Sequence, residues 1–234
     1  MPAGGIYLFR PGGSSGRVTL AAFGRVYRQL DIDTLAGASD HASATLGSGD
    51  DDAMATRIVL TYADLVAMPA DGKRYELHEG EIYMTAVPRP RHQQVIGNLY
   101  LILTAHVRRL GLGDVFLSPV DVILAEVTVV EPDLIYLDAA RLGRVSDRGI
   151  EGPPTLAIEV LSPSTAAADR GVKLQLSAKY GVPHYWIVDQ DARIIETYRL
   201  AGLSYEPGPR LDGPTPAALP PFPDLLLDPV SVWR

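Results

Sequence analysis

The sequence predicts an α/β fold in which helices flank a mixed β-sheet. Apolar residues at helical spacing predict an amphipathic helix from about Arg91 to Leu110. Three apolar segments typical of strands follow it: VFLSPVDVILA, TVVEPDLIYL and PTLAIEVL. A second helix, from about Ala166 to Tyr180, precedes a last pair of strands. This order of elements favours an α/β sandwich around a mixed sheet.

The elements before the long helix are shorter. Thr61 is a good N-cap for the short helix YADLVAM, and Asp64 follows three residues later as an imperfect capping box. The segment RYELHEGEIYMTA then alternates as an N-terminal β-hairpin would, with Glu79-Gly80 as its turn. We therefore expect a small hairpin ahead of the main sheet.

The last strands and the tail follow the second helix. Gly181-Val182-Pro183 ends that helix, and the strands HYWIVD and RIIETYRL are joined by a short polar turn. Tyr185 and Trp186 are most simply core residues of the first of these strands. The chain after residue 206 is rich in proline, which predicts an extended tail along the surface.

The length of 234 residues suits one substantial core. Residues 1–53 are rich in Gly, Ala, Ser and Asp and lack sustained periodicity, so we expect a poorly ordered N-terminal extension. Residues 54–234 then form a single domain that ends in the proline-rich tail.

Composition excludes several classes of protein. The chain has no cysteine, which excludes disulfides and thiolate metal sites. No window approaches the roughly 20 apolar residues of a membrane span, and the N-terminus lacks the apolar core of a signal peptide. We therefore expect a cytoplasmic protein without a membrane segment.

The net charge of -7 counts against a protein that coats nucleic acid, although an enzyme can still grip nucleic acid locally. Residues 86–113 contain no acid, and this stretch is a candidate surface for phosphate contacts. Its arginines are Arg89, Arg91, Arg108 and Arg109. The alternative is a solvated helix end and loop.

Two acids stand in apolar strands, Asp133 in VVEPDLIYL and Glu159 in PTLAIEVL. Alternation places Asp133 on the face of Ile135, and Glu159 on the face of Ala157 and Leu161. A carboxylate left unpaired there is costly. If the strands are neighbours, the two groups can hold Mg²⁺, or Mn²⁺, against a phosphate. Alternatively, each acid lies near a strand end and is solvated or salt-bridged.

These segments resemble the PD-(D/E)XK nuclease superfamily. More specifically, residues from about Tyr75 to Leu200 are similar to the Uma2 (DUF820) family of putative restriction endonucleases. The resemblance is carried, in order, by YELHEGEIYM, PRPRHQQVIGNLY, GDVFLSPVDVIL, VEPDLIYL, IEVLSPSTAAADRGVKLQLSAKYGVPHYWIVD and ETYRL. It implies a restriction-endonuclease-like core and a metal-dependent DNA endonuclease, with Asp133 and Glu159 as metal ligands.

One position departs from the superfamily pattern. The pattern has a lysine two residues after the second acid, where this chain has Leu161. The resemblance implies that Lys173, brought back by the following helix, replaces it as a migrated lysine. Its role would be to orient or activate the attacking water, or to stabilise the pentavalent phosphorus. A lysine on a helix is otherwise expected to be solvated.

Three further residues match segments of the family. Glu76 would be an additional metal ligand or would position the water. Asp121 would be a metal ligand or its partner, and a hydrogen-bonded edge residue is the alternative. His92 would contact phosphate or hold a carboxylate, and a purely structural histidine is the alternative.

The expected function is a metal-dependent endonuclease that cleaves DNA, and because many enzymes of this fold pair we expect a homodimer. Leu161 and the acidic balance favour one alternative, a catalytically inactive nuclease-fold protein that binds nucleic acid or a protein partner. The other alternative is a metal-dependent hydrolase of a small phosphate ester. Single- or double-stranded DNA and RNA are all compatible with the sequence.

Overall fold

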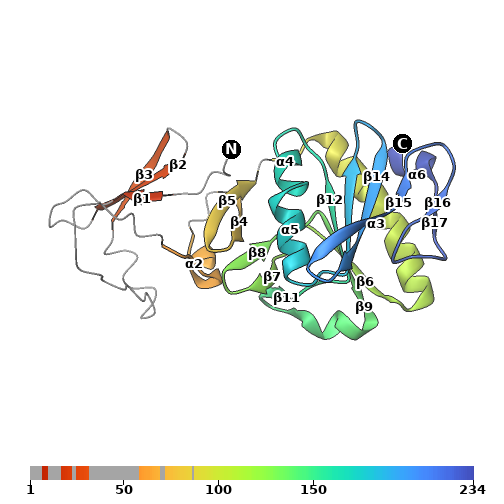
Figure 1. Cartoon of the computed structure of the whole chain (residues 1–234), viewed down its shortest axis with the longest axis horizontal. Helices are drawn as coiled ribbons and strands as arrows, with labels where there is room; N and C mark the ends of the chain where they lie inside the picture. Colours follow the sequence, from red (N-terminus) through yellow and green to blue (C-terminus); the bar gives the residue numbers. More distant parts are fainter. Residues whose placement is uncertain (1–6, 10–16, 23–24, 32–57, 69–71, 86) are drawn as a thin grey trace. The chain divides into compact units, whose positions relative to one another are not determined.

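The computed structural model describes residues 7–9, 17–22, 25–31, 58–68, 72–85 and 87–234 (Figure 1). It contains two compact units, one of residues 1–83 with 126–128 and the other of residues 84–125 with 129–234. The predicted boundary between residues 53 and 54 lies outside the described residues.

The first unit contains a small antiparallel sheet near the N-terminus, in the order β1-β2-β3. Its strands are β1 (Tyr7–Phe9), β2 (Arg17–Ala22) and β3 (Arg25–Asp31). The rest of residues 1–53, for which the sequence predicts a poorly ordered extension, lies outside the described residues.

The same unit contains helix α2 (Tyr62–Val66) and neighbouring strands β4 (Arg74–His78) and β5 (Glu81–Thr85). The N–H and Oγ1 of Thr61 both donate to Asp64 Oδ2, at 2.8 and 2.7 Å, so the expected cap forms. Glu79 and Gly80 turn the chain with φ of 52° and 82°. A Cβ at Gly80 would lie 2.4 Å from Val59 Cγ1, which favours glycine there.

The second unit is built on a six-stranded sheet in the order β15-β14-β13-β12-β9-β6 (Figure 1). Its strands are β6 (Gly113–Leu117), β9 (Leu134–Asp138), β12 (Leu156–Val160), β13 (His184–Asp189), β14 (Ile194–Ala201) and β15 (Ser204–Leu211). Only β12 and β13 pair in parallel among the neighbours in this sheet, so it is mixed, as predicted.

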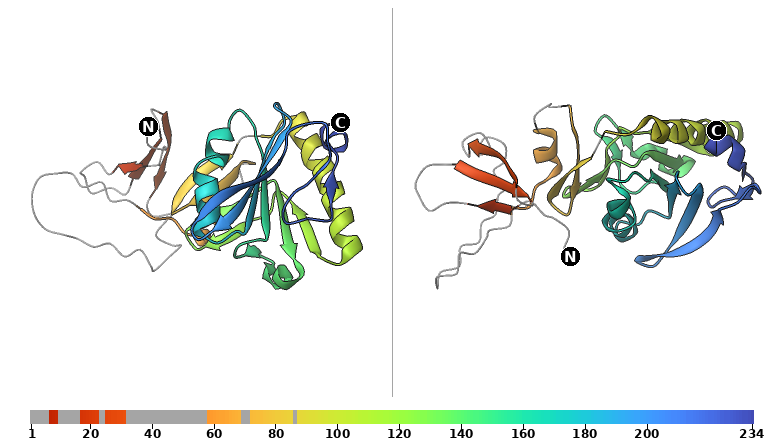
Figure 2. Two further views of the ribbon diagram at one scale, coloured as in Figure 1. Left: turned by 45° about the vertical axis from the view of Figure 1, so that its right-hand side comes forward. Right: turned by 90° about the horizontal axis from the view of Figure 1, so that it is seen from above.

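Helices cover both faces of this sheet (Figure 2). Helix α3 (Pro90–Leu110) packs Val95, Leu99 and Leu103 against one face, in a cluster that includes Trp186. Helices α4 (Ala166–Asp169) and α5 (Val172–Lys179) lie on the other face, where Tyr185 is buried. Each fully buried large apolar side chain contributes about 1.5–3 kcal/mol to stability, so these clusters fix α3 and α5 to the sheet.

Two sequence predictions were wrong in detail. The helix predicted from Ala166 to Tyr180 is broken at Arg170-Gly171, because Gly171 has a non-helical backbone (φ -116°, ψ -101°). The first two predicted strands are also interrupted: β7 (Val122–Ala125) and β8 (Thr128–Val130) separate from β6 and β9 at Pro119 and Pro132. Proline lacks the N–H that a strand ladder requires.

The remaining elements are short. They are η1 (Ala139–Arg144), β10 (Val145–Ser146), β11 (Gly149–Glu151), β16 (Ala217–Ala218), β17 (Leu226–Leu227) and α6 (Pro229–Trp233). The proline-rich tail is more structured than predicted. It forms the edge strand β15, where prolines are tolerated, and then α6. No helix in the described ranges is long and apolar enough to cross a membrane.

Candidate active site

The two acids singled out from the sequence lie at neighbouring strand ends in the second unit. Ile158 of β12 and Leu134 of β9 form the last residue pair between these strands, so Glu159 and Asp133 come immediately beyond it. Asp133 Oδ2 accepts a hydrogen bond of 2.8 Å from the N–H of Val160. Both acids are buried, at 7% and 3% exposure. The structure therefore brings them together, as expected.

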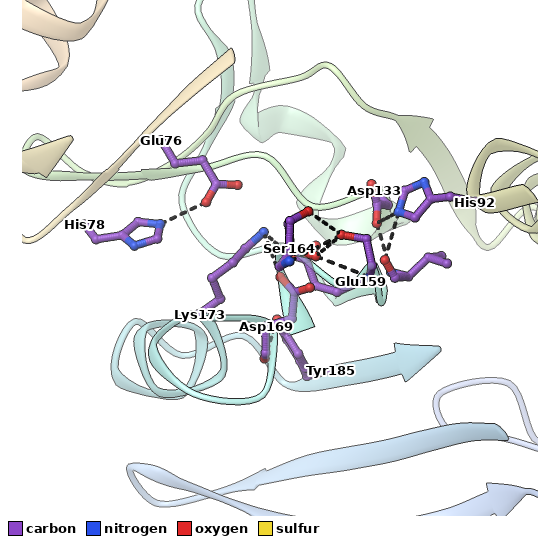
Figure 3. A network of polar contacts seen from close by, with 12 residues as sticks. Glu76, His78, His92, Asp133, Glu159, Ser164, Asp169, Lys173 and Tyr185 are labelled. Carbon is purple, nitrogen blue, oxygen red and sulfur yellow. Dashed lines mark hydrogen bonds and ion pairs between the residues drawn. The ribbon is translucent and has the colours of Figure 1, made fainter. Parts of the chain in front are cut away.

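His92, in the first turns of α3, holds Asp133 (Figure 3). Its Nε2 lies 2.8 Å from the carbonyl oxygen of Val160 and 3.2 Å from Asp133 Oδ2. Both partners are acceptors, so Nε2 carries the proton and donates. Burial alone would lower the pKa of His92, but the hydrogen bond and charge of Asp133 outweigh burial and raise it. Of its two expected roles, the contacts of His92 match the holding of a carboxylate.

Lys173 of α5 reaches Glu159 (Figure 3). Its Nζ lies 2.7 Å from Glu159 Oε1, and the lysine is itself buried. Leu161, which stands where the superfamily pattern has its lysine, packs in an apolar cluster with Tyr185 and Ile187. The ammonium beside Glu159 thus comes from a helix.

Asp169 is a member of this cluster that the sequence analysis did not single out. Its Oδ1 lies 3.5 Å from Lys173 Nζ, and the residue is only 2% exposed. Asp169 and Lys173 are four residues apart, and in the single helix predicted over 166–180 this spacing would place both side chains on one side, although the break at Gly171 lies between them in the structure. That spacing was the available signal in the sequence, but the prediction rested on acids in apolar strands, and Asp169 lies on a helix.

The cluster of acids around Lys173 carries a net negative charge and several carboxylate oxygens. Asp133, Glu159, Asp169 and Lys173 carry three carboxylates and one ammonium, a formal charge of -2 for these four side chains. Within the described residues, no three His, Asp or Glu side chains form a metal-binding group by themselves. Mg²⁺ retains several water ligands and usually binds to one or two carboxylates, so a pair of carboxylates is enough protein for a Mg²⁺ site.

Glu76 belongs to the first unit, where it is buried in β4. His78, two residues along the strand, places Nε2 2.9 Å from Glu76 Oε2, and its ring stacks on Tyr83 at 4.3 Å. His78 was not predicted from the sequence, although alternation in a strand places residues two apart on one face. The predicted role of Glu76 as a ligand stays a prediction.

Asp121 lies elsewhere in the second unit, half-buried just before β7. It lines a cleft of about 450 Å³ together with Glu131 and Arg148. Its carbonyl oxygen accepts a hydrogen bond of 2.8 Å from the N–H of Ile150. The predicted role of Asp121 as a metal ligand stays a prediction.

The four candidate DNA-binding arginines have different environments. The guanidinium of Arg91 donates to the carbonyl oxygen of Trp233 at 2.7 Å, and so ties α3 to α6. Arg108 forms an exposed ion pair with Asp114 at 3.1 Å. Arg89 and Arg109 are exposed at opposite ends of α3. A helix of this length spans about 30 Å, so these two side chains do not form one compact patch.

Comparison with known proteins agrees with this architecture. A family model described as Uma2, putative restriction endonuclease, matches residues 62–229. The chain is also similar to a solved structure, the crystal structure of a putative nuclease belonging to DUF820 from Anabaena variabilis ATCC 29413. The two are 20% identical with a TM-score of 0.63, over 74% of this chain and 97% of that chain, which shows a shared fold. No curated protein matches.

Proposed function

Because this chain belongs to the Uma2 family, within the PD-(D/E)XK nuclease superfamily, we propose that it is a metal-dependent endonuclease that hydrolyses phosphodiester bonds of DNA. One observation carries the proposal. A buried ammonium, Lys173 Nζ, lies 2.7 Å from Glu159 at the strand end beside Asp133. Two carboxylates and an ammonium at one strand end are the groups that phosphodiester hydrolysis needs.

Asp133 and Glu159 would hold the divalent cation, Mg²⁺ or Mn²⁺, through hard carboxylate oxygens. When bound, such a cation neutralises charge on the phosphate and makes a bound water a better nucleophile. His92 supports this role, because its Nε2–H keeps the Asp133 carboxylate fixed to the end of β12.

Lys173 would act on the attacking water and the phosphate. In hydrolysis, the water oxygen bonds to phosphorus, the bond to the bridging oxygen breaks, and that oxygen leaves with the electron pair and takes a proton. Two carboxylates lie within 3.5 Å of Nζ, an arrangement that suits an ammonium. Lys173 therefore orients the water and offsets negative charge in the transition state, rather than accepting the water's proton.

Arg89 and Arg109 are the arginines best suited to contact the DNA backbone, because both guanidinium groups are exposed. Arg91 and Arg108 already have protein partners. A homodimer, which we expected from the fold, stays a prediction.

The test is a plasmid-nicking assay with Mg²⁺, Mn²⁺ or EDTA. Wild type is compared with Asp133→Asn, Glu159→Gln and Lys173→Met, and the matched control is Glu206→Gln, which removes an exposed ion pair with Arg199. We expect nicking that requires the metal, falls on the order of 10²-fold or more in the three site variants, and persists in the control. Cleavage that survives Asp133→Asn unchanged would overturn the proposal.

Leu161 supports a second candidate, a nuclease-fold protein that binds nucleic acid or a protein partner without cleaving, because the lysine of the superfamily pattern is replaced there by an apolar core residue. This candidate predicts no nicking with any metal and no measurable Mn²⁺ affinity. A hydrolase of small phosphate esters would instead cleave a chromogenic phosphodiester and leave plasmid intact.

A further inference from the structure

We propose that Asp169 is a positioning residue, which keeps the Lys173 ammonium in the site when Glu159 binds the cation. This inference rests on the function proposed above and assigns a role to a residue outside the predicted set of ligands. Asp169 would touch neither cation nor substrate, and would act through Lys173.

The need for such a residue follows from the two tasks of Glu159. The same carboxylate pairs with Lys173 at 2.7 Å and is a proposed cation ligand. A divalent cation competes with the ammonium for that carboxylate, because both are attracted by the same charge. Lys173 therefore needs a second anionic partner that the cation does not use. Asp169 Oδ1, at 3.5 Å from Nζ, is in place for this task.

The main chain of Asp169 is anchored independently of Glu159. Its N–H donates to the carbonyl oxygen of Thr165 at 2.9 Å. Its own carbonyl oxygen lies 3.4 Å from the hydroxyl of Tyr185, a fully buried residue of β13 that donates to it. Asp169 thus keeps its place against the sheet whether Glu159 holds the ammonium or the cation.

The next residue along the chain, Arg170, also ties this segment to the sheet. Arg170 pairs with Glu196 of β14 at 2.5 Å and with Asp189 of β13 at 3.6 Å. The helix then breaks at Gly171, and α5 presents Lys173 (Figure 3). This segment therefore contacts the sheet through Arg170 and contacts the lysine through Asp169. The second partner of the Lys173 ammonium thus lies on a segment that is held to the sheet.

A purely structural ion pair makes a different prediction. If Asp169 only stabilises the fold, its replacement lowers the free energy of unfolding but leaves turnover of the folded enzyme unchanged. If it positions Lys173, turnover falls while substrate and cation binding persist. The two roles are separated by kinetics on folded protein.

The main variant is Asp169→Asn, with Asp169→Glu as the conservative replacement. The matched control is Glu206→Gln, which removes a carboxylate from an exposed ion pair with Arg199 and involves none of the partners of Lys173 described above. In full-length protein with Mn²⁺ and plasmid, we expect Asp169→Asn to lower kcat by roughly tenfold to a hundredfold, with KM and the Mn²⁺ Kd nearly unchanged. Asp169→Glu restores part of kcat, and Glu206→Gln retains the wild-type kcat.

A second readout does not depend on activity. Lys173 is labelled with an amine-reactive acetylating reagent, with and without Mn²⁺, and its modification rate is followed by peptide mass spectrometry. We expect Mn²⁺ to accelerate labelling several-fold more in Asp169→Asn than in wild type or Glu206→Gln. Equal labelling rates in wild type and Asp169→Asn would overturn the proposal, as would an unchanged kcat. If wild type does not nick DNA, the proposed function fails, and the labelling comparison still decides the role of Asp169.

Discussion

The ion pair between Lys173 and Glu159 is buried, so removing one partner leaves the other charge buried without compensation, which destabilises the fold. Lys173→Met leaves Glu159 and Asp169 buried without their ammonium, and we expect it to lower the free energy of unfolding by about 3–5 kcal/mol. Glu159→Gln in the same chain should recover part of this loss. Urea unfolding of both single variants and the double variant, in EDTA, measures the coupling.

The coupling is the quantity of interest because single substitutions also change packing. We expect the double variant to be more stable than the sum of the single effects by at least roughly 1 kcal/mol. Additive effects would mean that the charges of Lys173 and Glu159 have no measurable interaction energy in the folded protein.

His92 and His106 offer a matched pair on one helix. Both are buried at 5% exposure in α3, but His92 contacts Asp133, whereas His106 packs on Phe222. Partners that orient a metal ligand typically affect metal affinity by 10–100-fold. We therefore expect His92→Ala, but not His106→Ala, to weaken Mn²⁺ binding by about that factor in a calorimetric titration. Equal affinities in the two variants would remove His92 from the support of the site.

At the scale of elements, two glycines differ in what a methyl group would meet. A Cβ at Gly171, in the break between α4 and α5, would lie 2.7 Å from the carbonyl oxygen of Ala167. A Cβ at Gly97, inside α3, would meet nothing within 4 Å. Thermal unfolding should show that Gly97→Ala stabilises by roughly 0.5–1 kcal/mol, whereas Gly171→Ala destabilises by roughly 1–3 kcal/mol. Stabilisation by both would contradict the structure of the break.

The junction of β9 and η1 predicts a pH dependence. Asp138 accepts hydrogen bonds from the N–H of Arg141 at 3.0 Å and from Thr155 Oγ1 at 2.8 Å, and pairs with the Arg141 guanidinium. Burial alone would raise the pKa of Asp138, but the Thr155 hydrogen bond and the Arg141 charge lower it overall. The folded state therefore binds a proton at Asp138 less readily than the unfolded chain does.

The sign of the effect follows from that direction. Stability from the Asp138 carboxylate is fully present above its unfolded pKa and is lost as pH falls through the lower folded pKa. We expect Asp138→Asn, which keeps a capping side chain but removes the charge that pairs with Arg141, to cost roughly 0.5–1 kcal/mol at pH 7 and progressively less below about pH 4. Urea unfolding at several pH values measures the difference in the free energy of unfolding between wild type and Asp138→Asn. If that difference grows as the pH falls, the pKa of Asp138 is not lowered in the folded state.

At the scale of the whole molecule, hydrophobic periodicity in the sequence predicted the helices and strands whose apolar faces form the core. The apolar stripe of α3 placed the helix within one residue of its ends, and Tyr185 and Trp186 are fully buried as expected. Alternation also predicted that Glu159 shares a face with Ala157 and Leu161, which lie with α5 on one side of the sheet. Burial of apolar surface is encoded locally, so these features can be read from a single chain.

Features that depend on distant partners could not be predicted in this way. Arg91 donates to Trp233, 142 residues later, and no local pattern indicates that contact. Arg170, just before the break at Gly171, pairs with residues of β13 and β14 that come much later in the chain. The pairing of Lys173 with Glu159 was an implication of the family resemblance, whereas the contact with Asp169 emerged only with the structure.

The central claim is that the strand ends carrying Asp133 and Glu159 hold a divalent cation. The most direct measurement is an anomalous difference map from crystals of the full chain soaked in Mn²⁺. The account predicts one strong peak, within about 2.0–2.3 Å of carboxylate oxygens of both acids. No peak there, or a peak only in the cleft beside Asp121 and Glu131, would contradict it.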